Sequence, residues 1–472
     1  MHDTNPYLSG SFAPIDDERR VEHEALEIIG ELPRDLCGSY LRNGPNPRFT
    51  PRGLHHWFDG DGMVHALRFE DGRATYENRY VRTTWFEREG TAGECLFTGL
   101  MEPVQHNPRG APYKDTSNTD ILAFRGKAQT SWYMGGAAYE LDPVSLRTEG
   151  PMRYGAERPV KLSAHPKVDP RTGELHFFDY GPVAPYMRYG VVSAAGELTH
   201  LSDIALDGPR FPHDMALSEK HVVVMDPPLR VSERAKRAGR WGLELPADTP
   251  MRFGVLPHHG RGEDIHWFEA EPCYVYHTIN AWEEGDTLVL VGCRVRNPLP
   301  PIDPANGIYA VMMANLTMNA ELYEWRFDLR TGAVRERTLD DRNTEFPSMN
   351  VEQLGRPTRY SYNMRIAPTP TLRFDGVVKY DTTTGETSEH MFGPGRYGSE
   401  APFAPADPSR AQLAAHEDDG YLTSFVHDEG TGRSEVVVLR AQDLAAGPVA
   451  RVLLPRRVPL GFHACWVPTD RR

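Results

Sequence analysis

The feature of this sequence that most constrains its fold is a repeated pattern of short strands joined by turns. Short apolar or alternating runs typical of β-strands recur along most of the chain. The turns share an aspartate, a short polar run and a glycine that can supply a positive φ between antiparallel strands; they read FEDGRAT, LDPVSLRTEG, VDPRTGELHF, FDLRTGAVRE and YDTTTGETSE. Repeated hairpins predict an all-β fold and favour a β-propeller, whose radial sheets leave only short edges.

The length of the chain is compatible with one large unit. The sequence has 472 residues, which exceeds an ordinary domain, but large β-propellers form single domains of this size. At about seven blades, each blade would take roughly 65 residues and leave room for loops. The pattern has no clean period, so it does not fix the blade number. We expect a single β-propeller domain over residues 1–472.

Charge and cysteine content narrow the class of protein. The net charge of −14 disfavours nucleic acid, which needs a basic footprint, and polybasic docking to anionic lipid. The five cysteines are odd in number and widely spaced, so we expect buried thiols of a reducing compartment. The N-terminus lacks the pattern of a signal peptide, and no apolar run approaches 18 residues. These features predict a soluble cytoplasmic protein, and they remain compatible with a small neutral substrate.

Four histidines stand in contexts that resemble metal ligands at strand ends. They are His165 in KLSAHPK, His213 in FPHDMAL, His277 in YVYHTIN and His463 in GFHACW, separated by 48, 64 and 186 residues. Structural zinc sites prefer cysteines at short spacings, whereas an all-imidazole set suits iron, copper, nickel or zinc. Most of the 19 histidines in the chain are expected to be hydrogen-bonded residues only. The quartet nevertheless predicts a metal at the centre of a closed fold, with positions left open for chemistry.

Motifs along the whole chain carry a family resemblance. ELPRDLCGSYLRNGPNPRF and HHWFDGDGMVHALRFEDGRATYENRYVRT are followed by YELDP, GVLPHHGRGEDIHWF, EFPSMN, GSEAPFAP and GFHACW. Together with the histidine contexts, this order resembles the carotenoid cleavage oxygenase family. The resemblance implies a seven-bladed β-propeller with a nonhaem Fe(2+) on its axis, held by the four histidines. It also implies capping loops and short helices that enclose a substrate tunnel over the metal.

The resemblance extends to glutamates that support the metal ligands. In the family, glutamates accept hydrogen bonds from the outer ring nitrogens of three ligands, which orients each ring and increases its basicity. By local motif, Glu345 and Glu400 correspond to two of them. The third position departs from the family pattern, because SWYMGGAAYELDP places Tyr133 or Met134 where a glutamate is usual. We therefore expect one histidine to be held by a backbone carbonyl, a water or Tyr133.

The resemblance implies an oxidoreductase. The expected reaction is cleavage of a C=C bond of a lipophilic conjugated alkene by O2 into two carbonyl products, with no catalytic side chain beyond the metal centre. Two alternatives stay open: a non-oxidative isomerase, and an inactive propeller that binds lipophiles.

The substrate pocket is expected to include Phe58, Trp132, Tyr133 and Met134. Relatives that cleave phenolic alkenes carry a lysine beside the missing glutamate, and this chain has Trp132 or Tyr133 there. An ammonium favours a phenolate directly. The absence of this lysine favours an apocarotenoid as the substrate. The alternative is a stilbene or phenylpropenoid such as lignostilbene, resveratrol or isoeugenol.

A methionine-rich stretch raises the question of a membrane partner. In GIYAVMMANLTMNAEL, four side chains are adaptable apolar groups that line a tunnel, touch a membrane surface or fill the core: Met312, Met313, Leu316 and Met318. We favour ordinary core, and peripheral membrane contact stays open.

Overall fold

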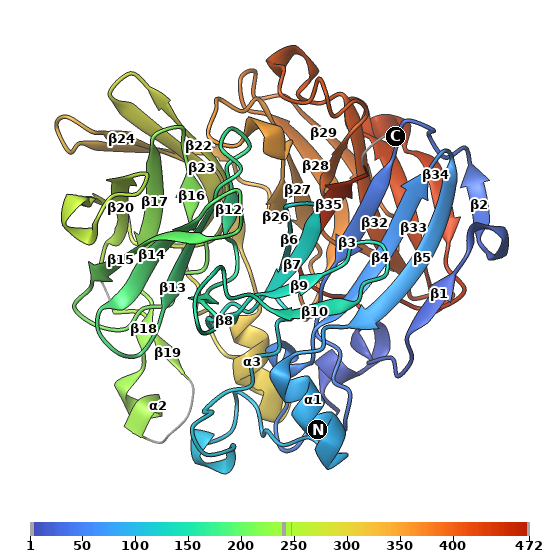
Figure 1. The fold of residues 1–472 in the computed structure, drawn as a ribbon, viewed down its shortest axis with the longest axis horizontal. Coiled ribbons are helices and arrows are strands. Elements are labelled where there is room, and N and C mark those ends of the chain that lie inside the picture. Colours follow the sequence, from blue (N-terminus) through green and yellow to red (C-terminus); the bar gives the residue numbers. More distant parts are fainter. Residues whose placement is uncertain (1–3, 238–241, 247, 470–472) are drawn as a thin grey trace.

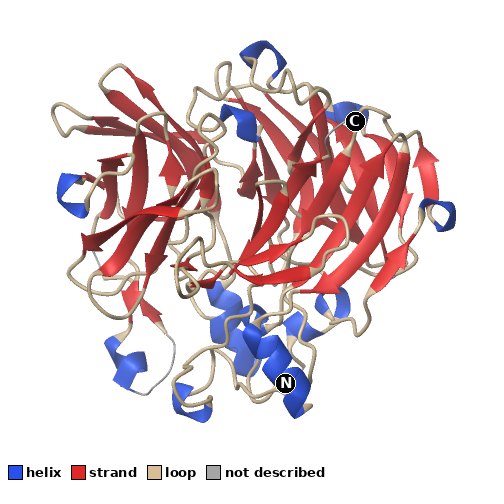
Figure 2. Cartoon of the chain, viewed as in Figure 1, coloured by secondary structure: helices blue, strands red, loops and turns tan. Residues whose placement is uncertain are grey.

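Strands dominate the structure. The computed structural model describes residues 4–237, 242–246 and 248–469. Figure 2 shows arrays of strands with few helical segments, and the predicted all-β class is confirmed. The predicted domain range 1–472 includes ends that lie outside the described residues, and the single domain stays a prediction.

The first sheet brings both ends of the described chain together. Its strands, in spatial order, are β1 (Arg19–Val21), β5 (Arg73–Tyr80), β4 (Met63–Glu70), β3 (Gly38–Arg42) and β35 (Ala464–Pro468). The second has the order β10 (Thr148–Pro151), β9 (Tyr139–Leu141), β7 (Lys127–Ser131) and β6 (Asp120–Phe124). A short pair joins β8 (Gly136–Ala137) to β11 (Lys161–Leu162). The chain therefore closes on itself in one sheet (Figure 1).

Three antiparallel four-stranded sheets follow along the chain. One contains β12 (Lys167–Val168), β13 (Leu175–Tyr180), β14 (Tyr186–Val192) and β15 (Leu198–Ala205). The next contains β16 (Ala216–Leu217), β17 (His221–Asp226), β20 (Met251–Pro257) and β21 (His266–Ala270). Between β17 and β20 in the sequence, β18 (Arg230–Val231) and β19 (Leu243–Glu244) form a separate two-stranded sheet. The third contains β22 (Tyr274–Glu284), β23 (Thr287–Val295), β24 (Ala320–Asp328) and β25 (Val334–Asp340).

The remaining strands form one continuous ten-stranded sheet. Its path runs through β2 (Glu27–Gly30), β34 (Pro448–Leu453), β33 (Arg433–Arg440), β32 (Gly420–Asp428), β30 (Arg396–Gly398), β28 (Phe374–Asp381), β27 (Tyr360–Ile366) and β26 (Thr344–Ser348). Two strands branch from it, β29 (Thr387–Met391) on β28 and β31 (Phe403–Pro405) on β32. Because pairing fuses these strands, separate sheets do not give a count of seven, and the blade number stays a prediction.

Burial along each strand explains the sequence pattern. The outer strand β15 alternates between exposed and partly buried residues along most of its length. The inner strands β17 and β23 are buried on both faces almost throughout, which is why they read HVVVMD and TLVLVGCRV. Apolar runs on both faces require a neighbouring sheet on each side. The core therefore lies between the sheets as layers of side chains.

The predicted hairpin turns are confirmed, with one exception. In three of them the aspartate accepts the N–H of the residue two positions later, and the glycine four positions later has a φ of 71°, 78° or 76°: Asp169 with Gly173, Asp328 with Gly332 and Asp381 with Gly385. In LDPVSLRTEG the turn takes its positive φ at Leu146, 51°, because Gly150, whose φ is 133°, already lies inside β10.

Helices are short and gather mostly at one end of the sheets. Figure 1 shows α1 (Thr84–Ala92) and α3 (Ala310–Asn315) in the lower centre of the view and α2 (Glu233–Arg237) at the lower left. The methionine-rich stretch forms α3 and its flank, and its four apolar side chains are buried in the largest core cluster. The core interpretation is confirmed, and a membrane patch made of those four side chains is excluded. No described helix is long and apolar enough to cross a membrane.

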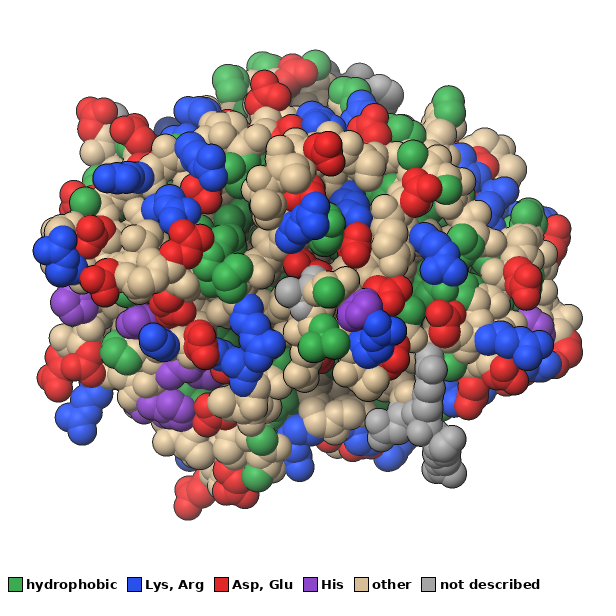
Figure 3. Space-filling view, turned by 90° about the horizontal axis from the view of Figure 1, so that it is seen from above, with side chains coloured by type: hydrophobic (Ala, Val, Ile, Leu, Met, Phe, Trp, Pro, Cys, Tyr) green, Lys and Arg blue, Asp and Glu red, His purple; other side chains and the backbone are tan. Residues whose placement is uncertain are grey.

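The surface carries charges of both signs (Figure 3), and the cysteines differ in burial. The face in Figure 3 carries acidic and basic side chains interspersed. Cys273 and Cys293 are buried, as predicted. The expectation of burial is wrong for Cys37, Cys95 and Cys465, which are partly exposed because they flank loops or sheet ends. All five are free thiols.

Candidate metal centre

Three loop positions and one position within a strand bring the histidines together. His165 lies between β11 and β12 with a φ of 66°, and the Asp120 carboxylate accepts its backbone N–H at 3.0 Å. His213 precedes β16, and His463 precedes β35. His277 lies within β22, where the pairing with β23 shifts register between Val275 and Thr278. A register shift turns a strand locally and re-aims a side chain. The local backbone therefore directs each ring inward.

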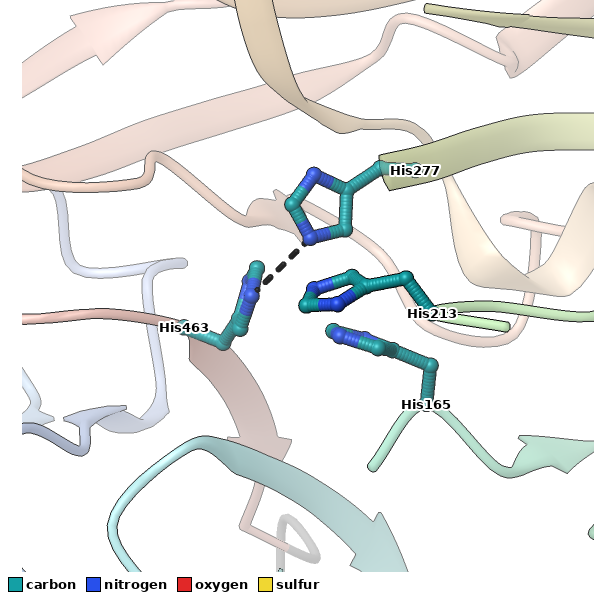
Figure 4. Close-up of side chains that lie close together, drawn as sticks. All are labelled: His165, His213, His277 and His463. Atoms are coloured by element: carbon teal, nitrogen blue, oxygen red, sulfur yellow. Dashed lines mark hydrogen bonds between the residues drawn. The ribbon is translucent and has the colours of Figure 1, made fainter. Parts of the chain in front are cut away.

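The four rings face one common point. Figure 4 shows the imidazoles converging from four separate segments. The ring of His165 lies 5.0 Å from that of His213, 4.9 Å from His277 and 4.5 Å from His463, measured between centroids. Nε2 of His277 lies 3.1 Å from Nε2 of His463. One donor nitrogen from each ring lies within 4.8 Å of all the others. The structure thus brings together all four predicted residues.

Burial keeps three of the rings neutral. Burial lowers the pKa of His165, His213 and His277 well below its usual value. His463 differs: burial lowers its pKa, but the carboxylates of Glu400, Asp120 and Glu345 together raise it above its usual value. Nε2 of His165 is buried and has no hydrogen-bond partner among the described residues. Neutral imidazoles with an unused lone pair are the form that binds a metal, so this donor set fits a borderline divalent ion.

Two glutamates lie behind two of the rings. Nδ1 of His277 contacts a carboxylate oxygen of Glu345, and Nδ1 of His463 lies 3.3 Å from Oε1 of Glu400. Each carboxylate also accepts a backbone N–H, from Phe346 and Ala464 respectively. Burial raises the pKa of Glu345 to about 8. The contacts leave the Nε2 atoms of both histidines facing the centre.

The third support position has no carboxylate. Tyr133 is buried, and its ring centroid lies 6.2 Å from that of His213. The Tyr133 hydroxyl has no hydrogen-bond partner within the part of the chain that the structure describes. The His213 ring also has no recorded hydrogen bond to any described residue. Of the two residues considered at this position, Tyr133 has its ring near that of His213.

The four predicted pocket residues lie together beside the centre. Trp132 and Tyr133 pack with Ala164, and three partly buried side chains join them: Phe58, Tyr113 and Met134. The ring of Phe58 lies 5.0 Å from that of Tyr133. A small pocket is lined by Trp132 and Tyr113, and none of the four histidines lines it.

Sequence reasoning missed an aromatic residue in direct contact with the rings. Phe346 stacks on His463, with centroids 4.5 Å apart and planes 13° apart, and lies edge-on to His277 at 4.9 Å. It has a φ of 49°. Phe346 directly follows Glu345 in EFPSMN, so the motif itself held the signal. Asp120 was also missed, and no local pattern marks it.

Comparisons with known proteins identify the family. The model of the retinal pigment epithelial membrane protein family matches residues 12–468. A carotenoid 9,10(9',10')-cleavage dioxygenase of Crocus sativus is 37% identical, over 98% of this chain and 89% of that protein. A carotenoid cleavage oxygenase of Mycobacterium tuberculosis is 31% identical, over 98% of both chains.

Solved structures agree with these matches. The lignostilbene dioxygenase of Pseudomonas brassicacearum superimposes with a TM-score of 0.87 at 27% identity, covering 98% of this chain and 99% of that one. A cobalt-substituted form of the Synechocystis apocarotenoid oxygenase superimposes with a TM-score of 0.83 at 26% identity, covering 97% of both. The predicted resemblance is confirmed: the chain belongs to the carotenoid cleavage oxygenase family, a family of dioxygenases.

Proposed function

We propose that this chain binds Fe(2+) through His165, His213, His277 and His463 and uses O2 to cleave a C=C bond of an apocarotenoid. The observation that carries the proposal is the convergence of four imidazole donors at one buried point. A set of neutral ligands leaves the full charge of a divalent ion uncompensated. When bound, the iron would supply the activation of O2.

The residues around the centre have distinct roles in this proposal. Glu345 and Glu400 hold the His277 and His463 rings through their outer nitrogens. Phe346 packs against both rings and restricts their rotation. Tyr133 and Phe58 supply an apolar wall beside His213 that excludes water. The two atoms of O2 end in the two carbonyl groups, so the reaction balances without an organic cofactor or an acid and base from the protein.

The electrostatics near Tyr133 favour a neutral substrate. Burial raises the pKa of the Tyr133 hydroxyl well above its usual value, and the neighbouring groups Tyr180 and Asp59 raise it further. The same surroundings would disfavour a phenolate bound beside Tyr133, because burial and the nearby Tyr180 and Asp59 all act against a negative charge there. This supports an apolar polyene over a 4-hydroxyphenyl alkene.

One observation keeps the phenolic alkene as the second candidate. The buried Tyr133 hydroxyl lacks a partner among the described residues, and a substrate hydroxyl would satisfy it. A neutral phenol of a stilbene or phenylpropenoid fits this role. The candidates therefore differ in whether the Tyr133 hydroxyl is used.

Peripheral membrane contact would explain how a lipophilic alkene reaches the chain. The methionines near α3 are buried, but Ile302, Ile308 and Val311 are about half exposed next to them. We assign membrane contact to these three side chains, because exposed branched apolar groups lose water on contact with lipid. Cytoplasmic localisation remains our expectation.

The deciding experiment is product analysis with labelled oxygen. Iron-loaded protein is incubated with apocarotenals, resveratrol and isoeugenol under ¹⁸O₂, and product masses are recorded. We expect two carbonyl products from an apocarotenal, each carrying the label after correction for exchange with water. A rearranged, unlabelled product would show an isomerase instead. Iron binding with neither O2 consumption nor turnover would show a lipophile-binding protein.

A further inference from the structure

A second group of histidines lies outside the centre described above, between two neighbouring sheets. It consists of Asp169 in the turn between β12 and β13, His176 in β13, and His258, which follows β20. One donor atom from each residue lies within 4.8 Å of the other two. The rings of His176 and His258 lie 4.7 Å apart between centroids. The group therefore joins the β12–β15 sheet to the β16–β21 sheet.

Both rings hold an unused nitrogen in a buried place. His176 is fully buried, and its Nδ1 lies 2.8 Å from the Tyr189 hydroxyl. Nε2 of His176 and Nε2 of His258 are both buried and lack hydrogen-bond partners among the described residues. Burial lowers the pKa of His176 to about 3 and also lowers that of His258. Two neutral imidazoles that aim unsatisfied nitrogens into one space are unusual, because buried polar atoms are nearly always paired.

Carboxylates complete the donor set. Asp169 is fully buried, and its two oxygens accept hydrogen bonds from Arg171 at 2.8 and 2.7 Å. A carboxylate oxygen has a second lone pair, so this contact leaves a coordination position free. Oε2 of Glu174 lies 4.0 Å from Nε2 of His176 and 3.3 Å from Nε2 of His259. Two acidic groups against one arginine leave the site negative.

We propose that Asp169, His176 and His258 bind a second divalent metal ion of the zinc type, which cross-links the two sheets. Two imidazoles and one carboxylate with room for water or Glu174 match the ligands that zinc prefers. Donor atoms of a tetrahedral zinc site lie about 3.4 Å apart. His258 stands on a loop at the rim, so rotation of its side chain closes the site on the ion.

The experiment counts zinc on metal-free protein by equilibrium dialysis. Wild-type protein is expected to bind about two ions per chain, one at each group of histidines. His258→Ala should bind about one, and so should His277→Ala. The double variant should bind none. The matched control is His259→Ala, which removes the exposed neighbour of His258 and should keep both ions.

A second variant and a second readout guard against loss of folding. Asp169→Asn keeps the shape and the oxygen that holds the turn, and should weaken the second zinc at least about tenfold. The zinc-dependent rise in melting temperature should be smaller in both second-site variants than in the His259→Ala control. One ion per chain in the wild type would overturn the site. Equal zinc binding by His258→Ala and the wild type would also overturn it.

Discussion

At the scale of single residues, the environment decides what each histidine can do. His176 and His165 are both neutral because burial lowers their pKa. His463 has a raised pKa because the carboxylates of Glu400, Asp120 and Glu345 together outweigh burial. A ring with a raised pKa takes up a proton more readily when no metal is bound. The proton and the metal compete for the same ring nitrogen. The same side chain thus has different affinities for protons at different positions.

The first prediction concerns the four central histidines. Alanine at any of His165, His213, His277 or His463 should remove most of the bound iron and abolish alkene cleavage, because each contributes one donor nitrogen. Iron is measured by metal analysis after dialysis. The matched control is His427→Ala, a buried histidine bonded to Ser434, which should keep its iron. Full iron in one of the four variants would remove that residue from the ligand set.

The second prediction concerns the supporting carboxylates. Glu345→Gln and Glu400→Gln should each lower iron affinity or turnover by roughly 10- to 100-fold, because the amide loses the charge that orients the ring. Competition with a chelator gives the affinity. Glu435→Gln is the control, since this buried glutamate pairs with Arg451 away from the centre. If all three variants hold iron equally well, the two glutamates do not support the ligands.

The third prediction separates the two substrate classes. Tyr133→Phe removes only the hydroxyl that lacks a partner. We expect kcat/KM for apocarotenals to stay within about twofold, because a polyene makes no hydrogen bond there. For a 4-hydroxystilbene, kcat/KM should fall by about 2- to 12-fold, which corresponds to the 0.5–1.5 kcal/mol of one hydrogen bond. A large loss with apocarotenals would show that the Tyr133 hydroxyl acts through His213 instead.

At the scale of elements, β22 shows how much of the site a sequence reveals. Hairpins and apolar strands were predictable because their signals are local, as in the Asp169 to Gly173 turn. The register shift that aims His277 was not, because it depends on a distant residue: Asp214 accepts hydrogen bonds from the N–H and hydroxyl of Thr278 at 2.7 and 2.8 Å. The contact of Phe346 with the rings likewise follows only from the fold. The family motifs singled out the four histidines that converge, whereas their spacing alone did not show convergence.

The fourth prediction concerns this element. Asp214 also pairs with Lys167 at 2.7 Å, so Asp214→Ala leaves a cation and a backbone N–H unpaired. We expect a loss of about 3 kcal/mol in stability, together with weaker iron binding because His277 loses its aim. Asp226→Ala breaks the pairs with Arg210 and Arg252 and should cost similar stability without the loss of iron affinity. Equal iron affinity in the two variants would argue against a role of Asp214 in positioning His277.

At the scale of the whole molecule, closure of the fold and assembly of the centre are connected. β35 pairs with β3 from Gly38 opposite Pro468 to Arg42 opposite Ala464. The backbone of His463 continues this contact, because its carbonyl accepts the N–H of Asn43 at 2.9 Å. Pairing of the two ends therefore places the fourth imidazole.

The fifth prediction follows from that connection. Trp466 in β35 is buried against Phe69, so Trp466→Ala should cost about 3–5 kcal/mol. It should also weaken iron binding, although Trp466 is no ligand. Trp325→Ala is the control, because this buried tryptophan lies in another sheet and should cost similar stability alone. Chemical denaturation with and without iron measures both effects. Unchanged iron affinity in Trp466→Ala would show that iron binding does not depend on the pairing of β3 with β35.

The position of His463 also sets an order of events during biosynthesis. Ribosomes deliver the chain from its N-terminus, so the first three central histidines emerge while the fourth is still unmade. Before His463 is made, a nascent chain has at most three of the four central imidazoles. Strand β3 likewise has no β35 to pair with until the end of the chain is synthesised. If the four histidines hold the metal as proposed, the complete site forms only after synthesis of His463, and a chain interrupted upstream of His463 lacks it.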